Sequence, residues 1–294
     1  MKRVSTVVLA VGILFLTHLT ICYAGAPFNN LEGVGGVAFN PLAYTAGTSF
    51  TEKADTPSWK QIFSEPPPHE DIFAKPQIGV WYINLPQGGA DGTDWTTISV
   101  ADSFFFKRLE LSYGYEDVNL NKVQNIHKQS VGGKLLLVKE NYNDMTFIPA
   151  CSVGAIYKWT SASGLTDRDP SAWDYYAVAS KTITQLPIPV LLSAGVLSTR
   201  GVATGVLGFD HDRRFSWFGN IDFIPIKQVV IGFEYKQGAR FQDVTNADYF
   251  NVHAAWLVNK SLSLIGAYVN AGDSHEGGVV GLGSGLVLSI QYAF

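Results

Sequence analysis

Two residue types used by hydrolases, His127 and Ser130, stand close together at the start of a predicted strand. A histidine that accepts the proton of a serine hydroxyl creates a nucleophile, and a barrel lipase would hold such a pair on its outer face. Side chains alternate between the two faces of a strand, so residues three apart point to opposite faces unless a bulge intervenes. We therefore expect no enzymatic activity and propose no catalytic residue.

A run of five ionisable residues, Asp210-His211-Asp212-Arg213-Arg214, lies in a predicted outer connection. Two carboxylates and a histidine are ligands for a divalent ion, but alternate positions of an extended segment do not converge without a turn. The run Asp273-Ser274-His275-Glu276 has the same weakness. We interpret both as charged, solvated loops, and the two arginines of the first as contacts for lipopolysaccharide phosphates. The sequence predicts no metal site and no cofactor.

A further set of charged residues lies within segments that otherwise alternate between apolar and polar residues. Its members are Glu110, Glu116, Lys134, Lys158, Asp222, Glu234 and Lys236. Charged side chains in the wall of a membrane-spanning barrel are tolerable only toward the lumen. Their signs are mixed, whereas a pore selective for one sign normally has a ring of like charges. The set predicts either a weakly selective small channel or ion pairs that fill the lumen.

The element that must position these charges is a β-strand, and the clearest one ends the chain. Its alternate residues form one apolar and aromatic face: Leu286, Leu288, Ile290, Tyr292 and Phe294. The residues between them are small or polar, as on a strand with two different faces. A soluble antiparallel sheet would produce the same alternation. The aromatic last residue, with an aromatic two positions before it, resembles the terminal strand of bacterial outer-membrane barrels, which the barrel assembly machinery reads as a signal.

Segments of roughly ten residues, the length of a tilted strand that crosses a bilayer, follow one another from Gln77 onward. We predict twelve, at 77–85, 94–102, 107–116, 128–139, 147–158, 173–183, 188–198, 214–224, 228–237, 247–258, 261–270 and 283–294. Short and long connections alternate, and the longer ones include 117–127 and 199–213. This pattern is typical of an up-and-down antiparallel transmembrane β-barrel with both ends on the periplasmic side.

Aromatic residues near the strand ends are expected at the membrane interfaces. They are Trp81, Tyr82, Trp159, Trp173 and Trp217. The composition, 47% hydrophobic with only 16% charged residues, suits a lipid-facing sheet, although a soluble β-rich enzyme could share it. A formal net charge of −4 without a basic patch excludes a nucleic-acid partner.

The N-terminus carries an export signal. A basic start, an apolar stretch and small residues before a cleavage site after Ala24 predict a signal peptide over residues 1–24. A lipoprotein signal ending at Cys22 is the weaker interpretation, because Ile21 is not small. Cleavage leaves Cys151 as the one cysteine of the mature chain, which excludes an intramolecular disulfide. Residues 25–76 are rich in glycine and then proline, and we interpret them as a periplasmic extension, a plug in the barrel mouth or a disordered linker.

Several stretches within residues 77–294 resemble a family of exported proteobacterial proteins. They are 108–113 (RLELSY), 131–135 (VGGKL), 153–158 (VGAIYK), 173–176 (WDYY) and 262–268 (LSLIGAY). That family is catalogued as a domain of unknown function and is generally taken to be an outer-membrane β-barrel. The resemblance implies the fold and the location and supplies no site residues.

Two functions remain open at this stage. The first is an outer-membrane barrel that acts as a channel or transport component for small polar solutes. The second is a non-conducting structural or assembly barrel that binds another envelope or polysaccharide-export protein through residues 25–76. In both cases we expect contacts with outer-membrane lipid and lipopolysaccharide and with the barrel assembly machinery.

Overall fold

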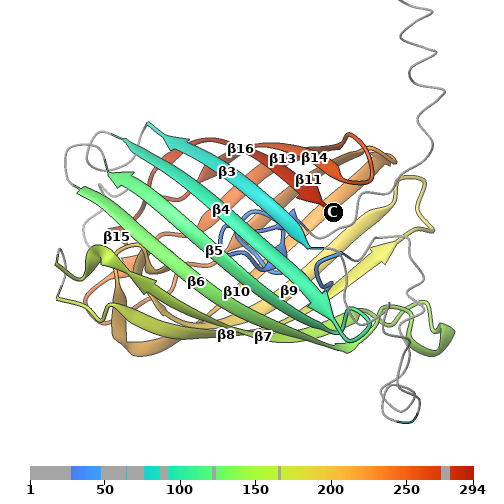
Figure 1. The fold of residues 1–294 in the computed structure, drawn as a ribbon, viewed down its shortest axis with the longest axis horizontal. Coiled ribbons are helices and arrows are strands. Elements are labelled where there is room, and N and C mark those ends of the chain that lie inside the picture. Colours follow the sequence, from blue (N-terminus) through green and yellow to red (C-terminus); the bar gives the residue numbers. More distant parts are fainter. Residues whose placement is uncertain are drawn as a thin grey trace, which may run out of the picture.

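Twelve antiparallel strands close into a barrel in this computed structural model, which describes residues 28–47, 64, 76–86, 92–120, 124–164, 167–272 and 279–294. The strands are β3 (Gln77–Leu85), β4 (Thr93–Phe104), β5 (Leu109–Leu120), β6 (Gln124–Val138), β7 (Ala150–Thr160), β8 (Ser171–Ile183), β9 (Val190–Gly201), β10 (Phe209–Ile226), β11 (Val229–Lys236), β13 (Tyr249–Leu257), β14 (Leu262–Asn270) and β16 (Ser284–Ala293). Each pairs with its neighbours in the chain, and β16 closes the barrel against β3 (Figure 1). The prediction of an all-β, up-and-down barrel of about twelve strands is confirmed.

Alternation along each strand separates an outer apolar face from an inner face. On β16, Leu286, Leu288 and Ile290 are 64%, 60% and 56% exposed, whereas Val287, Ser289 and Gln291 between them are buried. Tyr292 and Phe294 continue the outer row, with their rings 5.0 Å apart. A belt of exposed apolar side chains around a closed barrel is what a strand-built membrane protein presents to lipid. Among the described residues, no helix has the length and apolar character needed to cross a membrane.

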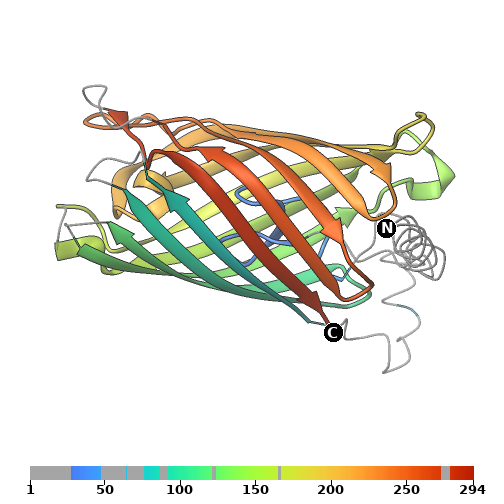
Figure 2. The same cartoon turned by 90° about the horizontal axis from the view of Figure 1, so that it is seen from above.

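The two ends of the barrel differ. Gln77 pairs with Ala293, so the start of β3 and the end of β16 lie together at what we call the terminal end. At the opposite, loop end, η4 (Val202–Gly205) and the parallel pair of β12 (Thr245–Asn246) with β15 (Val279–Val280) cover the mouth. The short helices η2 (Tyr142–Asp144) and η3 (Ser161–Gly164) lie in connections at the terminal and loop ends, respectively. Figure 2 shows the long, steeply tilted strands that join these ends.

Three details of the sequence prediction are wrong. The long loop expected at 117–127 is mostly strand, because β5 runs to Leu120 and β6 begins at Gln124. The charged run starting at Asp210 lies in the first part of β10 and not in a loop. Trp81 does not lie at a membrane interface. It is fully buried, because the odd-numbered residues of β3 face inward.

Residues 28–47, which we call the N-terminal segment, lie inside the barrel, where Figures 1 and 2 draw them in blue. All residues from Phe28 to Ala46 are buried. The short strands β1 (Phe28–Asn29) and β2 (Gly35–Gly36) pair with each other and not with the barrel. The segment is therefore held in the lumen by side chains and packing. The expected signal peptide and most of residues 48–75 lie outside the described residues.

Candidate functional site

A tight turn in the N-terminal segment presents one carboxylate, Glu32, to the barrel wall. The Asn30 side-chain oxygen accepts hydrogen bonds from the backbone N–H groups of Glu32 and Val34, both at 3.0 Å, which is the usual way an Asn stabilises a turn. Gly33 has φ of 88°, and a Cβ there would stand 2.5 Å from the carbonyl oxygen of Tyr113. Only glycine allows this conformation so close to β5.

The Glu32 carboxylate binds two lysines from neighbouring strands. Lys128 Nζ on β6 lies 3.1 Å from Glu32 Oε1, and Lys158 Nζ on β7 contacts the same oxygen. Each lysine also has a partner in the wall, Glu116 at 2.8 Å from Lys128 and Asp174 at 2.7 Å from Lys158. All five side chains are at least nine-tenths buried. One carboxylate of the segment thus bridges two ion pairs of the wall.

A second pair, Glu110 on β5 and Lys134 on β6, holds the backbone of the segment. Glu110 accepts hydrogen bonds from the N–H groups of Gly35 at 2.9 Å and Ala46 at 2.7 Å. Lys134 Nζ donates to the carbonyl oxygens of Gly35 at 2.6 Å and Tyr44 at 2.8 Å, and lies 3.2 Å from Glu110. Charge-assisted hydrogen bonds of this kind are about twice as strong as neutral ones. The two charges therefore fix both ends of residues 35–46.

The third group of contacts comes from β10, β11 and β13. Glu234 accepts hydrogen bonds from the N–H groups of Phe39 at 3.0 Å and Asn40 at 2.6 Å. The Asn251 amide donates to Glu234, and its oxygen lies 2.8 Å from His253 Nδ1. His253 Nε2 lies 2.7 Å from Asp222, whose other oxygen accepts from Asn220. A buried, connected polar network therefore begins at the N-terminal segment and continues down the wall.

Part of the remaining wall is apolar and holds the segment by packing. The apolar inward residues of β3, β4, β14 and β16 that form one cluster with Phe28, Leu31 and Phe39 are Trp81, Ile83, Leu85, Trp95, Ile265, Ala267, Val269 and Val287. We call them the apolar wall. The inward ionised residues of β5–β8, namely Glu110, Glu116, Lys128, Lys134, Lys158 and Asp174, are the charged wall. The polar contacts of the apolar wall include Trp81 Nε1, which donates to the Asn29 carbonyl oxygen at 2.9 Å.

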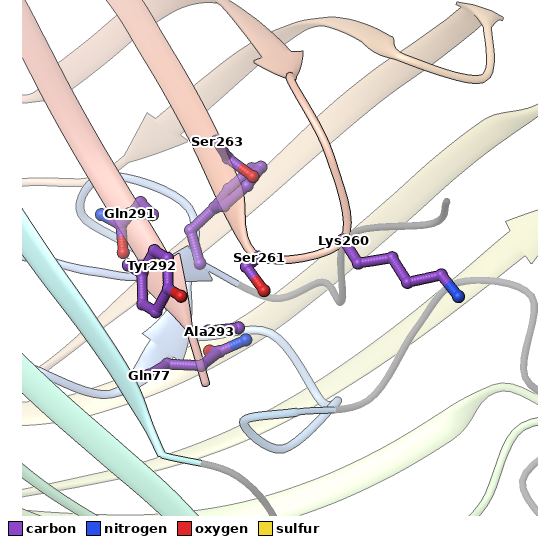
Figure 3. A pocket seen from close by; sticks show the side chains of 8 residues that line it. Gln77, Lys260, Ser261, Ser263, Gln291, Tyr292 and Ala293 are labelled. Carbon is purple, nitrogen blue, oxygen red and sulfur yellow. The ribbon is translucent and has the colours of Figure 1, made fainter. Parts of the chain in front are cut away.

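The terminal end of the lumen is narrow. The Gln291 amide donates to the Asn29 carbonyl oxygen at 3.2 Å, and the Asn29 amide donates to the carbonyl oxygen of Gln77 at 2.9 Å. A cavity of about 10 Å³ beside these residues is lined by Phe28, Gln77, Lys260, Ser261, Ser263, Gln291, Tyr292 and Ala293 (Figure 3). A space of that size holds one water molecule at most. Among the described residues, the N-terminal segment thus contacts both β3 and β16 at this end.

Apolar side chains of the described loop residues are buried at the loop end. Val202, Ala203 and Val206, in and after η4, are at most 2% exposed, and Leu282 is 4% exposed. Ala203, Val206 and Leu282 belong to the same cluster as Trp95, so they pack against the apolar wall. Residues 28–47 thus lie in the middle of the lumen, and buried apolar residues of the described loops lie at the loop end.

All seven charged residues predicted for the lumen are buried, and six of them contact other ionised groups or the N-terminal segment as described above. The Lys236 side chain, 8% exposed, makes no hydrogen bond or ion pair with any described residue. Their role in transport stays a prediction. The sequence prediction missed four further members: Glu32, Lys128, Asp174 and His253. Strand alternation could have found Lys128 and Asp174, because they share a face with Lys134 and Tyr176, respectively.

Of the three motifs considered for catalysis and metal binding, two do not form sites, and the third, 273–276, lies outside the described residues. The His127 side chain is 47% exposed on the outside, whereas Ser130 is buried in the lumen. Asp210 forms an ion pair with Arg168 at 2.6 Å, and Asp212 forms one with Arg214 at 2.9 Å. In the part of the chain that the structure describes, no three His, Cys, Asp or Glu residues are grouped to hold a metal ion.

Residues 89–283 match the family described as "Protein of unknown function (DUF3034)". The chain belongs to this family. No curated protein matches it. Among solved structures, the KdgM porin is similar with a TM-score of 0.50 and 13% identity, over 74% of this chain and 99% of that chain.

Two other solved outer-membrane proteins are similar at a lower level. Omp33 of Acinetobacter baumannii has a TM-score of 0.45 and 9% identity, over 76% of this chain and 100% of that chain. An outer membrane channel from Pseudomonas putida F1 has a TM-score of 0.44 and 14% identity, over 78% of this chain and 99% of that chain. The likeness to the KdgM porin shows a shared closed-barrel fold.

Proposed function

We propose that this DUF3034 protein is an outer-membrane channel for small polar solutes, and that residues 28–47 are a removable plug that closes it. The proposal rests on one observation: charged residues of the barrel wall have their partners in the N-terminal segment. Glu110, Lys134, Lys128 and Lys158 all contact the N-terminal segment directly. In a barrel filled only by its own side chains, such charges would find all their partners within the wall.

The way the segment is bound is consistent with withdrawal. β1 and β2 pair with each other, and the barrel closes without either of them. Withdrawal of residues 28–47 therefore breaks no hydrogen bond between barrel strands. Barrels of eight strands are just filled by side chains, while those of 16 to 18 strands enclose aqueous channels. Twelve strands leave room for a chain segment, or for water and small solutes in its place.

The inner wall is suited to water once the segment has left. Besides the charged residues it carries many small polar side chains, including Thr97, Ser99, Ser112, Ser130, Ser152, Ser180, Ser193 and Ser289. The mixed signs of the charges favour weak selectivity between cations and anions over the whole lumen. Polar solutes of low molecular weight are therefore the proposed cargo.

Single-channel conductance in planar bilayers tests the proposal. Protein lacking residues 1–24 is compared with protein that also lacks residues 28–47, and heat-modifiable gel mobility shows whether each barrel has folded. We expect rare or no steps from the first protein and regular steps from the second. A folded, truncated barrel that stays silent would contradict the channel proposal.

The second candidate, a non-conducting structural or assembly barrel, is favoured by the apolar cover at the loop end. Val202, Ala203, Val206 and Leu282 would still close that mouth after the segment has left. In that case residues 25–76 would bind another envelope protein. A silent truncated barrel, together with crosslinks between residues 25–76 and one periplasmic protein in cells, is the expected outcome for this candidate.

The proposal includes the route by which the protein reaches the membrane. We propose export by a signal peptide cleaved after Ala24, and recognition of Leu286, Leu288, Ile290, Tyr292 and Phe294 by the barrel assembly machinery. Sequencing of the mature N-terminus is expected to begin at Gly25. Arg213, which lies over the Tyr175 ring at 5.0 Å on the outer side of the wall, is a candidate contact for lipopolysaccharide phosphate.

A further inference from the structure

The charges around Glu32 balance only when the N-terminal segment is in place. Lys128, Lys158 and Lys236 face Glu116 and Asp174 in the wall, and Glu32 supplies the third negative charge. Without Glu32, three buried cations would face two carboxylates. An unbalanced buried charge is costly, so an anion is expected to replace the lost carboxylate.

A small cavity next to these lysines contains further unused hydrogen-bonding groups. Its volume is about 10 Å³, and its lining includes Lys158, Asp174 and Lys236. The Lys236 side chain is 8% exposed and has no hydrogen-bond or ion-pair partner among the described residues. The hydroxyl oxygens of Thr204, Ser216 and Tyr249, which also line the cavity, are buried without a hydrogen-bond partner.

The two observations meet at Lys158, which binds the Glu32 carboxylate and lines the cavity. We propose that Lys128, Lys158 and Lys236 form a binding site for the carboxylate of a small hydroxylated organic acid, and that Glu32 occupies this site when the segment fills the lumen. Thr204, Ser216 and Tyr249 would then bind hydroxyl groups of the same ligand. Asp174 does not compete, because its oxygens already accept from Lys158 and from the Arg200 N–H at 3.4 Å.

Other charged residues in the lumen do not neutralise the positive charge of the three lysines. Glu110 is paired with Lys134 at 3.2 Å, and Asp222 lies 2.7 Å from His253. Glu234 is satisfied by the N–H groups of Phe39 and Asn40 and by Asn251 while the segment is in place. The lumen as a whole is therefore of mixed charge, and the preference for a carboxylate is local to the three lysines. The inference deepens the proposed channel function by naming a substrate class.

Chemical rescue in the full-length chain tests the site without the need for an open channel. Glu32→Ala removes the internal carboxylate, and acetate is added as the probe at constant ionic strength, with acetamide as its neutral counterpart. We expect acetate to raise the apparent Tm of the variant by about 2–4 °C and to leave the wild type unchanged. If Glu32→Ala does not refold in chloride buffer, the yield of folded barrel with acetate becomes the readout.

The lysines are tested by adding a second substitution. Lys158→Met in the Glu32→Ala background should abolish the rescue, whereas Lys260→Met, on an exposed turn, should leave it intact. No rescue, or equal rescue by acetamide, would overturn the inference. Rescue by acetate in a barrel that never conducts would leave the site standing while contradicting the channel proposal.

Extension to hydroxylated acids has its own readout. Glycolate, which is acetate with one hydroxyl group added, should rescue Glu32→Ala at lower concentration than acetate, and the advantage should fall in the Ser216→Ala and Tyr249→Phe variants. Glycolamide, the neutral amide of glycolate, should have no effect. A glycolate rescue that is no better than acetate would contradict the assignment of the three hydroxyls.

Discussion

The charged wall and the apolar wall hold the same segment by different means. On the charged wall, Glu110 and Lys134 form hydrogen bonds with the backbone of residues 35–46, and Lys128 and Lys158 form ion pairs with Glu32. On the apolar wall the polar contacts are few, and contact is mostly the packing of rings and aliphatic chains around Trp81 and Trp95. Hydrogen bonds and ion pairs depend on direction and distance, whereas apolar packing depends mainly on the area buried.

The difference assigns separate tasks to the two walls. Apolar burial stabilises the barrel together with its contents, because Trp81 and its neighbours also belong to the strands themselves. The charged contacts fix the position of the segment and would be satisfied by water or a ligand after it leaves. We therefore expect substitutions in the apolar wall to weaken the whole barrel, and substitutions in the charged wall to release the segment from an intact barrel.

The largest effect is expected from Trp81→Ala. Trp81 is fully buried and donates to the Asn29 carbonyl oxygen at 2.9 Å, so truncation leaves a large cavity and removes one of the two hydrogen bonds to that oxygen. The expected loss in the free energy of unfolding is about 4 kcal/mol. Urea unfolding in lipid vesicles, followed by gel mobility, measures it.

A tryptophan on the lipid side provides the control for this prediction. Trp256 is 54% exposed on the outer face of β13, and Trp256→Ala should cost clearly less. Equal losses at the two positions would mean that the apolar wall contributes no more to stability than the outer surface does.

The twelve strands could be predicted from the sequence because their signal is local. Alternation along a segment such as Leu286–Phe294 depends only on neighbouring residues and on the need to separate lipid from lumen. The same alternation placed Glu110, Lys134 and Glu234 on the inner face. Trp81 was assigned to an interface because aromatic residues near strand ends usually lie there, although the period of β3 puts it inside.

The N-terminal segment illustrates what a local pattern cannot give. Glu32 stands in a turn between two-residue strands, and nothing near it in the sequence identifies Lys128 and Lys158 as its partners. Its place depends on contacts between residues 96 and 126 positions apart. The sequence left plug, extension and linker open for residues 25–76 for the same reason. Long-range side-chain contacts, which alternation does not report, decide where this segment lies.

A smaller effect, confined to the segment, is expected from Glu32→Gln. The amide keeps the shape but leaves Lys128 and Lys158 without the charge they share, at a cost of about 3 kcal/mol. A cysteine at Ala46, in a Cys151→Ser background without residues 1–24, reports release of the segment through its rate of labelling by a maleimide. We expect labelling roughly 100-fold faster, with unchanged gel mobility of the barrel.

The control for Glu32→Gln is Asp117→Asn, a carboxylate whose side chain is 48% exposed near His127. Its labelling rate should match that of the parent protein. If Glu32→Gln instead weakened the barrel as much as Trp81→Ala, the proposed division of tasks between the walls would be wrong.

The smallest effects are expected from glycine-to-alanine substitutions, one on a strand of each wall. A Cβ on Gly114, in the charged wall's β5, would stand 2.8 Å from the carbonyl carbon of Glu32, which is backbone and cannot turn aside. Gly114→Ala should therefore push the segment away at a cost of about 2 kcal/mol. The labelling rate of the cysteine placed at position 46 should rise about 30-fold. A Cβ on Gly79, in the apolar wall's β3, would meet the end of the Gln291 side chain at 2.4 Å, which can rotate. Gly79→Ala should change the labelling less, and the opposite order would show that packing at the terminal end, not the charged wall, positions the segment.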